Sequence, residues 1–120
     1  DFIVLGDMND YVNQGEEHLS GITPLTSSPH MEDVVSRVPK EDRWTYCYRK
    51  EKAYNQLDYI FLSRSLAERN PDVLPLIERR GMPRNVNMPG KAPMVREFFD
   101  GVTTKDSASD HAGVAVSIEF

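Results

Sequence analysis

The stretch Phe2–Asp10 constrains this chain most, because it joins four consecutive apolar residues to a glycine and a cluster of polar side chains. Four apolar residues rich in β-formers are typical of a short strand that is buried on both faces. Gly6 ends the run, and Asp7, Asn9 and Asp10 follow at once. Such a cluster indicates either a turn capped by Asp and Asn side chains or a site positioned by a rigid strand. The stretch by itself leaves both interpretations open.

The bulk composition indicates one modest globular domain. The chain has 120 residues, of which 39 % are hydrophobic and 28 % are charged. That length suits one domain with one core. No apolar run is long enough to span a membrane, and the single cysteine, Cys47, excludes a disulfide within the chain. Because the sequence begins directly on a core-like strand, we expect it to be part of a longer protein.

Charge is distributed unevenly along the chain. The first 36 residues contain acidic side chains and no Lys or Arg, whereas basic residues outnumber acidic ones between Arg79 and Lys105. The net charge of −5 argues against a surface that coats nucleic acid. An acidic end that could hold a cation and a basic segment that could meet a phosphate suit a phosphate-processing site, although charge runs are more often solvated faces.

The residue pattern predicts a strand-rich chain with short helices. We expect strands at 2–5, 44–48, 57–62 and 113–120, an edge strand or an irregular segment at 73–77, and helices at 31–38 and 63–69. We also expect a helical turn near 16–19 and a long loop at 81–109 with a brief strand or turn around 94–99. The strands at 44–48 and 57–62 should pair as a hairpin. We interpret Trp44, Tyr46, Cys47 and Tyr48 as core side chains, and His18 and His30 as exposed loop histidines.

Two further polar clusters lie at strand boundaries. Asp58 stands among large apolar residues of the strand at 57–62. If its carboxylate is buried it requires a partner, because an unpaired buried charge is very costly. Asp110 and His111 form an acid–imidazole pair between the long loop and the final strand. Each cluster alone is a weak signal, since a solvent-facing Asp on a strand is common.

The order of the three motifs is specific. Gly-Asp-Met-Asn at 6–9 is followed by Leu-Asp-Tyr-Ile at 57–60 and by Ser-Asp-His at 109–111, ahead of a closing strand. In this order the sequence resembles the endonuclease/exonuclease/phosphatase superfamily, whose fold is DNase I-like. The resemblance covers essentially the whole chain, but only the C-terminal half of the family's catalytic domain. It implies an α/β (α+β) chain that forms half of a four-layer sandwich, with one mixed, mostly antiparallel sheet and short helices.

The resemblance also implies a site that hydrolyses phosphodiesters. Asp7 would position or deprotonate the attacking water, and Asn9 would donate to a phosphate oxygen. Asp110 would take part in metal binding, and hard oxygen ligands suit Mg²⁺, Mn²⁺ or Ca²⁺. His111 would contact the phosphate and take part in acid–base chemistry. Asp58 would hold the His111 ring in position and favour its charged form.

Residues around these motifs are assigned lesser roles. Asp10 extends the first motif, and we interpret it as a turn-capping residue or as a neighbour that supports the site. Arg79, Arg80 and Arg84 are expected to contact a phosphate backbone or head group of the substrate.

Three functions stay open at this stage. The first is a metal-dependent phosphodiesterase, foremost a nuclease with nucleic acid as substrate, and the second is a phosphomonoesterase or lipid phosphodiesterase on the same scaffold. The third is a catalytically silent binding or scaffolding relative.

The family takes a metal-binding Asn and Glu and a further His from the N-terminal half of its domain, so residues 1–120 alone should be inactive. Without that half, one apolar face of the sheet should be exposed to solvent or should be covered by a second copy of the chain in a homodimer.

Overall fold

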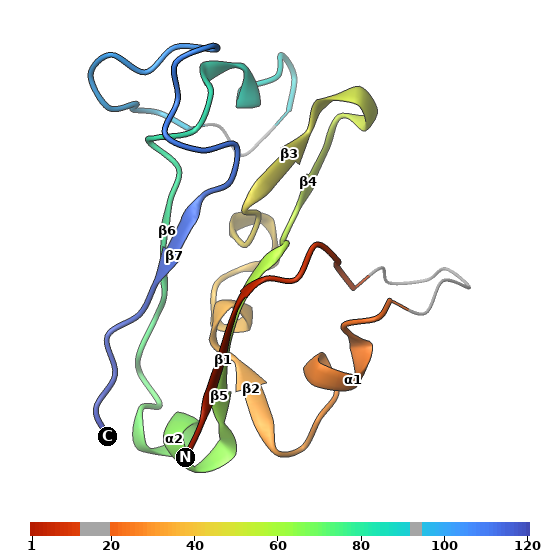
Figure 1. Cartoon of the computed structure of the whole chain (residues 1–120), viewed down its shortest axis with the longest axis vertical. Helices are drawn as coiled ribbons and strands as arrows, with labels where there is room; N and C mark the ends of the chain where they lie inside the picture. The colour runs from red at the N-terminus through yellow and green to blue at the C-terminus, as the bar shows by residue number, and fades with distance from the viewer. Residues whose placement is uncertain (13–19, 92–94) are drawn as a thin grey trace.

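The computed structural model describes residues 1–12, 20–91 and 95–120 and shows a mixed α+β domain with antiparallel sheets and few short helices (Figure 1). The strands are β1 (Ile3–Asp7), β2 (Met31–Asp33), β3 (Tyr46–Tyr48), β4 (Ala53–Asn55), β5 (Asp58–Ser63), β6 (Leu76–Glu78) and β7 (Gly113–Ala115). The helices are α1 (Thr23–Thr26) and α2 (Arg64–Arg69), and 3₁₀ turns cover Val34–Arg37, Lys40–Asp42, Arg49–Glu51 and Arg84–Val86.

The described strands form three small antiparallel sheets, whereas the sequence predicts a single sheet. One sheet has the order β1-β5-β2, a second pairs β3 with β4, and a third pairs β6 with β7. Five of the strands have only three residues each, so each of them pairs with its neighbour over three positions and then ends. The prediction of antiparallel pairing is confirmed, and the prediction of one continuous sheet is wrong for these residues.

The second sheet is a local hairpin that the sequence misassigns. The 3₁₀ turn Arg49–Glu51 leads to Lys52, whose φ of 51° places it in the left-handed region. That conformation reverses the chain at once, so Tyr46 lies opposite Asn55 instead of opposite a residue of β5. Strand β5 is therefore available to pair with β1 and β2.

Strand β1 lies at the edge of its sheet and is not buried on both faces, as its sequence predicts. Among the described strands β5 is its only neighbour, and Phe2 and Leu5 are 45 % and 66 % exposed. An apolar run shows that burial would be favourable, but it does not specify which segment covers the strand. The exposed side chains of β1 agree with the expected uncovered apolar sheet face.

Strand β5 is the buried centre of the larger sheet. On one face Ile60 and Leu62 pack with Val34 and with Leu66 of α2, and residues 114–118 cover this cluster. On the other face the packing includes the stacked rings of Tyr59 and Phe61, together with the buried side chain of Ile22. Because both faces of β5 are covered, the strand forms a rigid platform, and Asp58 is its first residue.

A second core lies between the β3–β4 hairpin and the long segment that follows β6. It consists of the buried side chains Trp44, Cys47, Met82, Val86, Met88 and Ala112. The prediction that Trp44 and Cys47 are core residues is confirmed. Tyr48 is 37 % exposed and Tyr46 is only partly buried, so these two rings do not belong to the core as predicted.

The helices are short, and one of the two predicted ones is confirmed. Ser63 is the N-cap residue of α2, which ends before Asn70, as the sequence predicts. Residues 31–38 instead form β2 and a 3₁₀ turn, because a carboxylate oxygen of Asp33 accepts a hydrogen bond from the Val35 amide and starts the turn. In the described ranges, no helix is long and apolar enough to cross a membrane.

The C-terminal strand is shorter than predicted. Strand β7 ends at Ala115 because its partner β6 has only three residues. Val116 and Ile118 nevertheless pack against the β5 core beyond the paired residues, whereas Phe120 is 84 % exposed. Residues 95–99 form no strand and His30 is exposed. The helical turn near 16–19, His18 and residue 94 lie outside the described residues.

Candidate functional site

The end of β1 and the start of β5 meet directly opposite each other. Asp7 and Asp58 are register partners in the antiparallel pair, so their side chains emerge on the same side of the sheet. The chain leaves β1 through a tight turn, in which a carboxylate oxygen of Asp7 accepts a hydrogen bond from the Asn9 amide at 2.8 Å. Asn9 adopts a φ of 49°, a conformation that Asn tolerates better than most residues. The turn and the site proposed from this stretch thus coexist.

His111 reaches the same place from the far end of the chain. Its Nδ1 atom lies 2.8 Å from Oδ2 of Asp58, and the side chains of His111 and Asp58 are only 23 % and 19 % exposed. The backbone of His111 forms a β-bridge with Tyr46, and the two rings lie 5.0 Å apart between centroids. The partner that Asp58 requires is therefore His111, as the resemblance implies.

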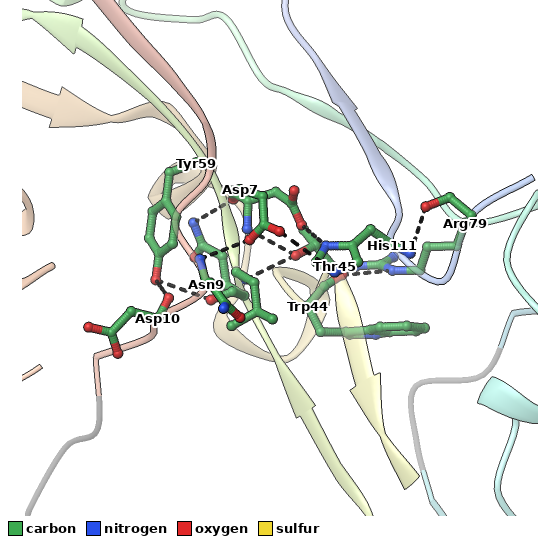
Figure 2. A network of polar contacts seen from close by, with 12 residues as sticks. Asp7, Asn9, Asp10, Trp44, Thr45, Tyr59, Arg79 and His111 are labelled. Atoms are coloured by element: carbon green, nitrogen blue, oxygen red, sulfur yellow. Dashed lines mark hydrogen bonds and ion pairs between the residues drawn. The ribbon is translucent and has the colours of Figure 1, made fainter. Parts of the chain in front are cut away.

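The imidazole of His111 lies between two carboxylates (Figure 2). Its second nitrogen, Nε2, is 3.9 Å from Oδ2 of Asp7, which is too long for a direct hydrogen bond. A gap of this kind suits a bridging water or a substrate oxygen. The side chain of Asp7 is 49 % exposed, so this edge of the ring faces solvent while the Asp58 edge does not.

The surroundings of His111 favour its protonated form. Partial burial by itself would lower the pKa of the imidazole. The hydrogen bond with Asp58 and the negative charges of Asp58, Asp7 and Asp110 outweigh this effect and raise the pKa above its ordinary value of 6.5. His111 therefore carries a positive charge at pH values at which a solvent-exposed histidine is already neutral.

Thr45, which is not among the predicted site residues, forms hydrogen bonds with the backbone on both sides of the Asp58–His111 pair. Its hydroxyl accepts hydrogen bonds from the amides of Leu57 and Asp58, and its carbonyl accepts one from the Ala112 amide. Thr45 is completely buried, and Figure 2 shows it beside His111. A threonine between two aromatic residues of a strand gives no functional signal, because threonine is a common strand residue.

The remaining predicted site residues on the first and third motifs lie around the pair. Asp110 is exposed and directly precedes His111 in the chain, and its charge acts on the ring. The side chain of Asn9 is also exposed. Asp10 accepts hydrogen bonds from the amides of Tyr11 and Ile22, which confirms the turn-capping interpretation.

The three arginines predicted to bind substrate make contacts within the protein. Arg79 donates to the carbonyls of Trp44 and Asp42 and stacks on the Trp44 ring. Arg80 pairs with Glu78 and lies over Phe99. Arg84 donates to the Val102 carbonyl and lies over Phe98. These contacts stabilise the segment that follows β6.

Three side chains at the site are close enough together to hold a cation. Carboxylate oxygens of Asp7 and Asp58 and a ring nitrogen of His111 all lie within 4.8 Å of one another. A metal ligand must be a neutral imidazole, whereas the hydrogen bond with Asp58 and the nearby negative charges raise the pKa of His111 and favour its protonated form. We therefore interpret Asp58–His111 as a hydrogen-bonded acid–imidazole pair. The exposed Asp110, which the sequence predicts as the metal ligand, does not belong to this cluster.

Comparisons with family models, curated proteins and solved structures give no match to this chain. The function is therefore inferred from the geometry of the three motifs.

Proposed function

We propose that this chain contributes Asp7, Asn9, Asp58, Asp110 and His111 to a centre for metal-dependent hydrolysis of phosphodiesters, foremost that of a nuclease. One observation carries the proposal. The imidazole of His111 is hydrogen-bonded to Asp58 at one nitrogen and faces Asp7 across 3.9 Å at the other. Asp7, Asp58 and His111 are brought together from distant parts of the sequence, and the Nε2 edge of the ring lies beside the half-exposed carboxylate of Asp7, where a substrate could reach it.

The chemistry follows from the roles of these side chains. A water molecule attacks phosphorus in line with the leaving oxygen, and negative charge develops on the phosphoryl oxygens. The protonated Nε2 atom of His111 donates a hydrogen bond to one of these oxygens, while Asp58 fixes the ring and keeps it charged. Asp7 orients the water and accepts its proton, and the Asn9 amide group donates to a phosphate oxygen.

A hard divalent cation, Mg²⁺, Mn²⁺ or Ca²⁺, would be held by the carboxylate of Asp110, directly or through water. When bound, it would neutralise charge on the non-bridging phosphate oxygens. The resemblance places further ligands, a Glu and an Asn, in an N-terminal half of the domain, together with the second sheet of a DNase I-like sandwich. That half would cover the exposed side chains of β1 and complete the site.

The same five residues would serve a phosphomonoesterase or a lipid phosphodiesterase, because these reactions share the attack of water on phosphorus. A catalytically silent binding or scaffolding relative is the alternative from another class. The joint presence of the five residues argues against it, since a silent relative is free to lose any of them.

Cleavage of supercoiled plasmid DNA by the full-length protein tests the proposal. We expect nicking that requires Mg²⁺ and that Asp110→Ala reduces by at least about 100-fold. Asp100→Asn, which removes an exposed carboxylate from the same long segment, is the matched control and should leave the rate unchanged. Cleavage of phosphomonoesters or phospholipids in place of DNA would select the second function, and no metal-dependent hydrolysis of any of the three substrates would refute the enzymatic proposal.

A further inference from the structure

We infer that Thr45 is a positioning residue that sets the distance between Asp58 and His111. The inference deepens the proposed function and rests on it, because it concerns how the acid–base pair is assembled. Thr45 touches neither the carboxylate of Asp58 nor the ring of His111 in the hydrogen-bond network. It acts on both through the main chain.

Thr45 joins the three segments that meet at the site. Its amide donates to the carbonyl of Asn55 at 2.9 Å, which ties it to β4. Its hydroxyl oxygen accepts from the amides of Leu57 at 3.0 Å and Asp58 at 3.1 Å, at the start of β5. Its carbonyl accepts from the amide of Ala112 at 2.8 Å, one residue beyond His111. Asp58 and His111, which are 53 positions apart, are thus each held to the same residue.

The hydroxyl is the chemically specific part of this arrangement. The amides of Leu57, which precedes β5, and of Asp58, its first residue, both donate to one oxygen atom. Thr45 is 0 % exposed, so water cannot readily replace that oxygen. Valine has nearly the same shape as threonine but offers no acceptor. In a Thr45→Val variant the two amides would lack a partner, and unpaired buried amides are strongly unfavourable. The start of β5 is then expected to shift and to carry the Asp58 carboxylate away from His111.

The carbonyl of Thr45 would stay in place in such a variant, so the His111 segment should remain attached to β3. The contact between the rings of Tyr46 and His111 should survive for the same reason. The substitution therefore separates the two members of the pair instead of removing both. This separation distinguishes a positioning role from a general contribution to the core.

The test compares Thr45→Val with Thr45→Ser, which keeps the hydroxyl. Thr103→Val is the matched control, because the Thr103 hydroxyl also accepts from two amides, those of Lys105 and Asp106, in an exposed turn. Two NMR readouts on this chain do not require activity. They are hydrogen-exchange protection of the Leu57 and Asp58 amides and the low-field resonance of the His111 Nδ1 proton in its bond to Asp58.

We expect Thr45→Val to reduce the protection of the Leu57 and Asp58 amides by at least about tenfold and to abolish the low-field resonance. Thr45→Ser should restore both, and Thr103→Val should leave both unchanged. The inference is overturned if the valine variant keeps the resonance at its original position. If the valine variant does not fold, the serine variant decides, because loss of the resonance despite the retained hydroxyl also overturns the inference.

Kinetics on the full-length protein supply a second readout. A displaced acid–base group is expected to lower kcat by about tenfold or more and to leave KM within about twofold, with serine restoring kcat. A valine variant that loses the NMR signature but keeps kcat would show that Thr45 positions the pair and that the pair does not catalyse. In that case the proposed function fails and the structural role of Thr45 stands.

Discussion

The Nδ1 atom of His111 lies 2.8 Å from a carboxylate oxygen of Asp58, although 53 positions separate the two residues. The pair is formed because β5 is buried on both faces and presents Asp58 as its first residue, while the backbone of His111 bridges to Tyr46. A hydrogen bond between a carboxylate and an imidazole fixes the tautomer and the orientation of the ring.

The pKa of His111 should fall in Asp58→Asn. Partial burial lowers the pKa, and the hydrogen bond and charge of Asp58 are the leading causes that raise it above 6.5, so their removal should lower it. Titration of the imidazole proton resonances by NMR measures the change. Asp106→Asn, an exposed carboxylate outside the ring's environment, is the control, and an unchanged titration in Asp58→Asn would contradict the assigned cause.

The same pair should make stability depend on pH in one direction. Because the pKa of His111 is higher in the folded than in the unfolded chain, the stabilisation is fully present below pH 6.5 and is lost as the pH rises through the raised value. Urea denaturation should therefore show a larger difference in the free energy of unfolding between the wild type and His111→Ala at pH 5.5 than at pH 8.5. Equal differences at the two pH values would refute this linkage.

Glu78 should titrate far below an ordinary glutamate. Its hydrogen bonds with Arg80 are the main cause that lowers the pKa of this carboxyl from 4.5 to about 2. The small contribution of the pair to stability is present above pH 4.5 and is lost as the pH falls through about 2. Arg80→Gln should return the pKa toward 4.5, as NMR of the carboxyl carbon can measure, whereas Arg96→Gln should not.

Arg79 should act as a structural residue. Its guanidinium donates to the carbonyls of Trp44 and Asp42 and covers the Trp44 ring. Lysine cannot reproduce this planar fork, so we expect Arg79→Lys to lower the free energy of unfolding by about 1–3 kcal/mol. Chemical denaturation measures the loss, and Arg96→Lys, at an exposed position, is the control. Unchanged stability together with weaker substrate binding would favour the substrate contact predicted from the sequence.

The exposed side chains of β1 should drive association of the isolated chain. Leu5 is 66 % exposed and lies in a strand that has β5 as its only neighbour among the described strands, a combination that favours contact with another chain. Light scattering should show concentration-dependent dimers that Leu5→Lys weakens. A wild-type chain that stays monomeric at all concentrations would count against a homodimer.

The sequence predicts the pairing of Asp58 with His111 better than it predicts the arrangement of the strands. Asp58 is found because a carboxylate within an apolar strand requires a partner, and the identity and order of the motifs point to His111. The burial of β1 and the pairing of β3 are predicted incorrectly, because both depend on where distant segments lie and on the left-handed turn at Lys52. Thr45 is missed because hydrogen bonds to main-chain amides leave no pattern in the sequence.

The most direct test of the account is the rate of phosphodiester cleavage by the full-length protein and its His111→Ala variant in Mg²⁺. We predict that the wild type cleaves DNA and that the variant is slower by about 10²–10⁴-fold, the usual contribution of an acid–base group. Serving as control, His30→Ala should retain the wild-type rate, because His30 is an exposed loop residue. A His111→Ala variant as active as the wild type would contradict the central claim.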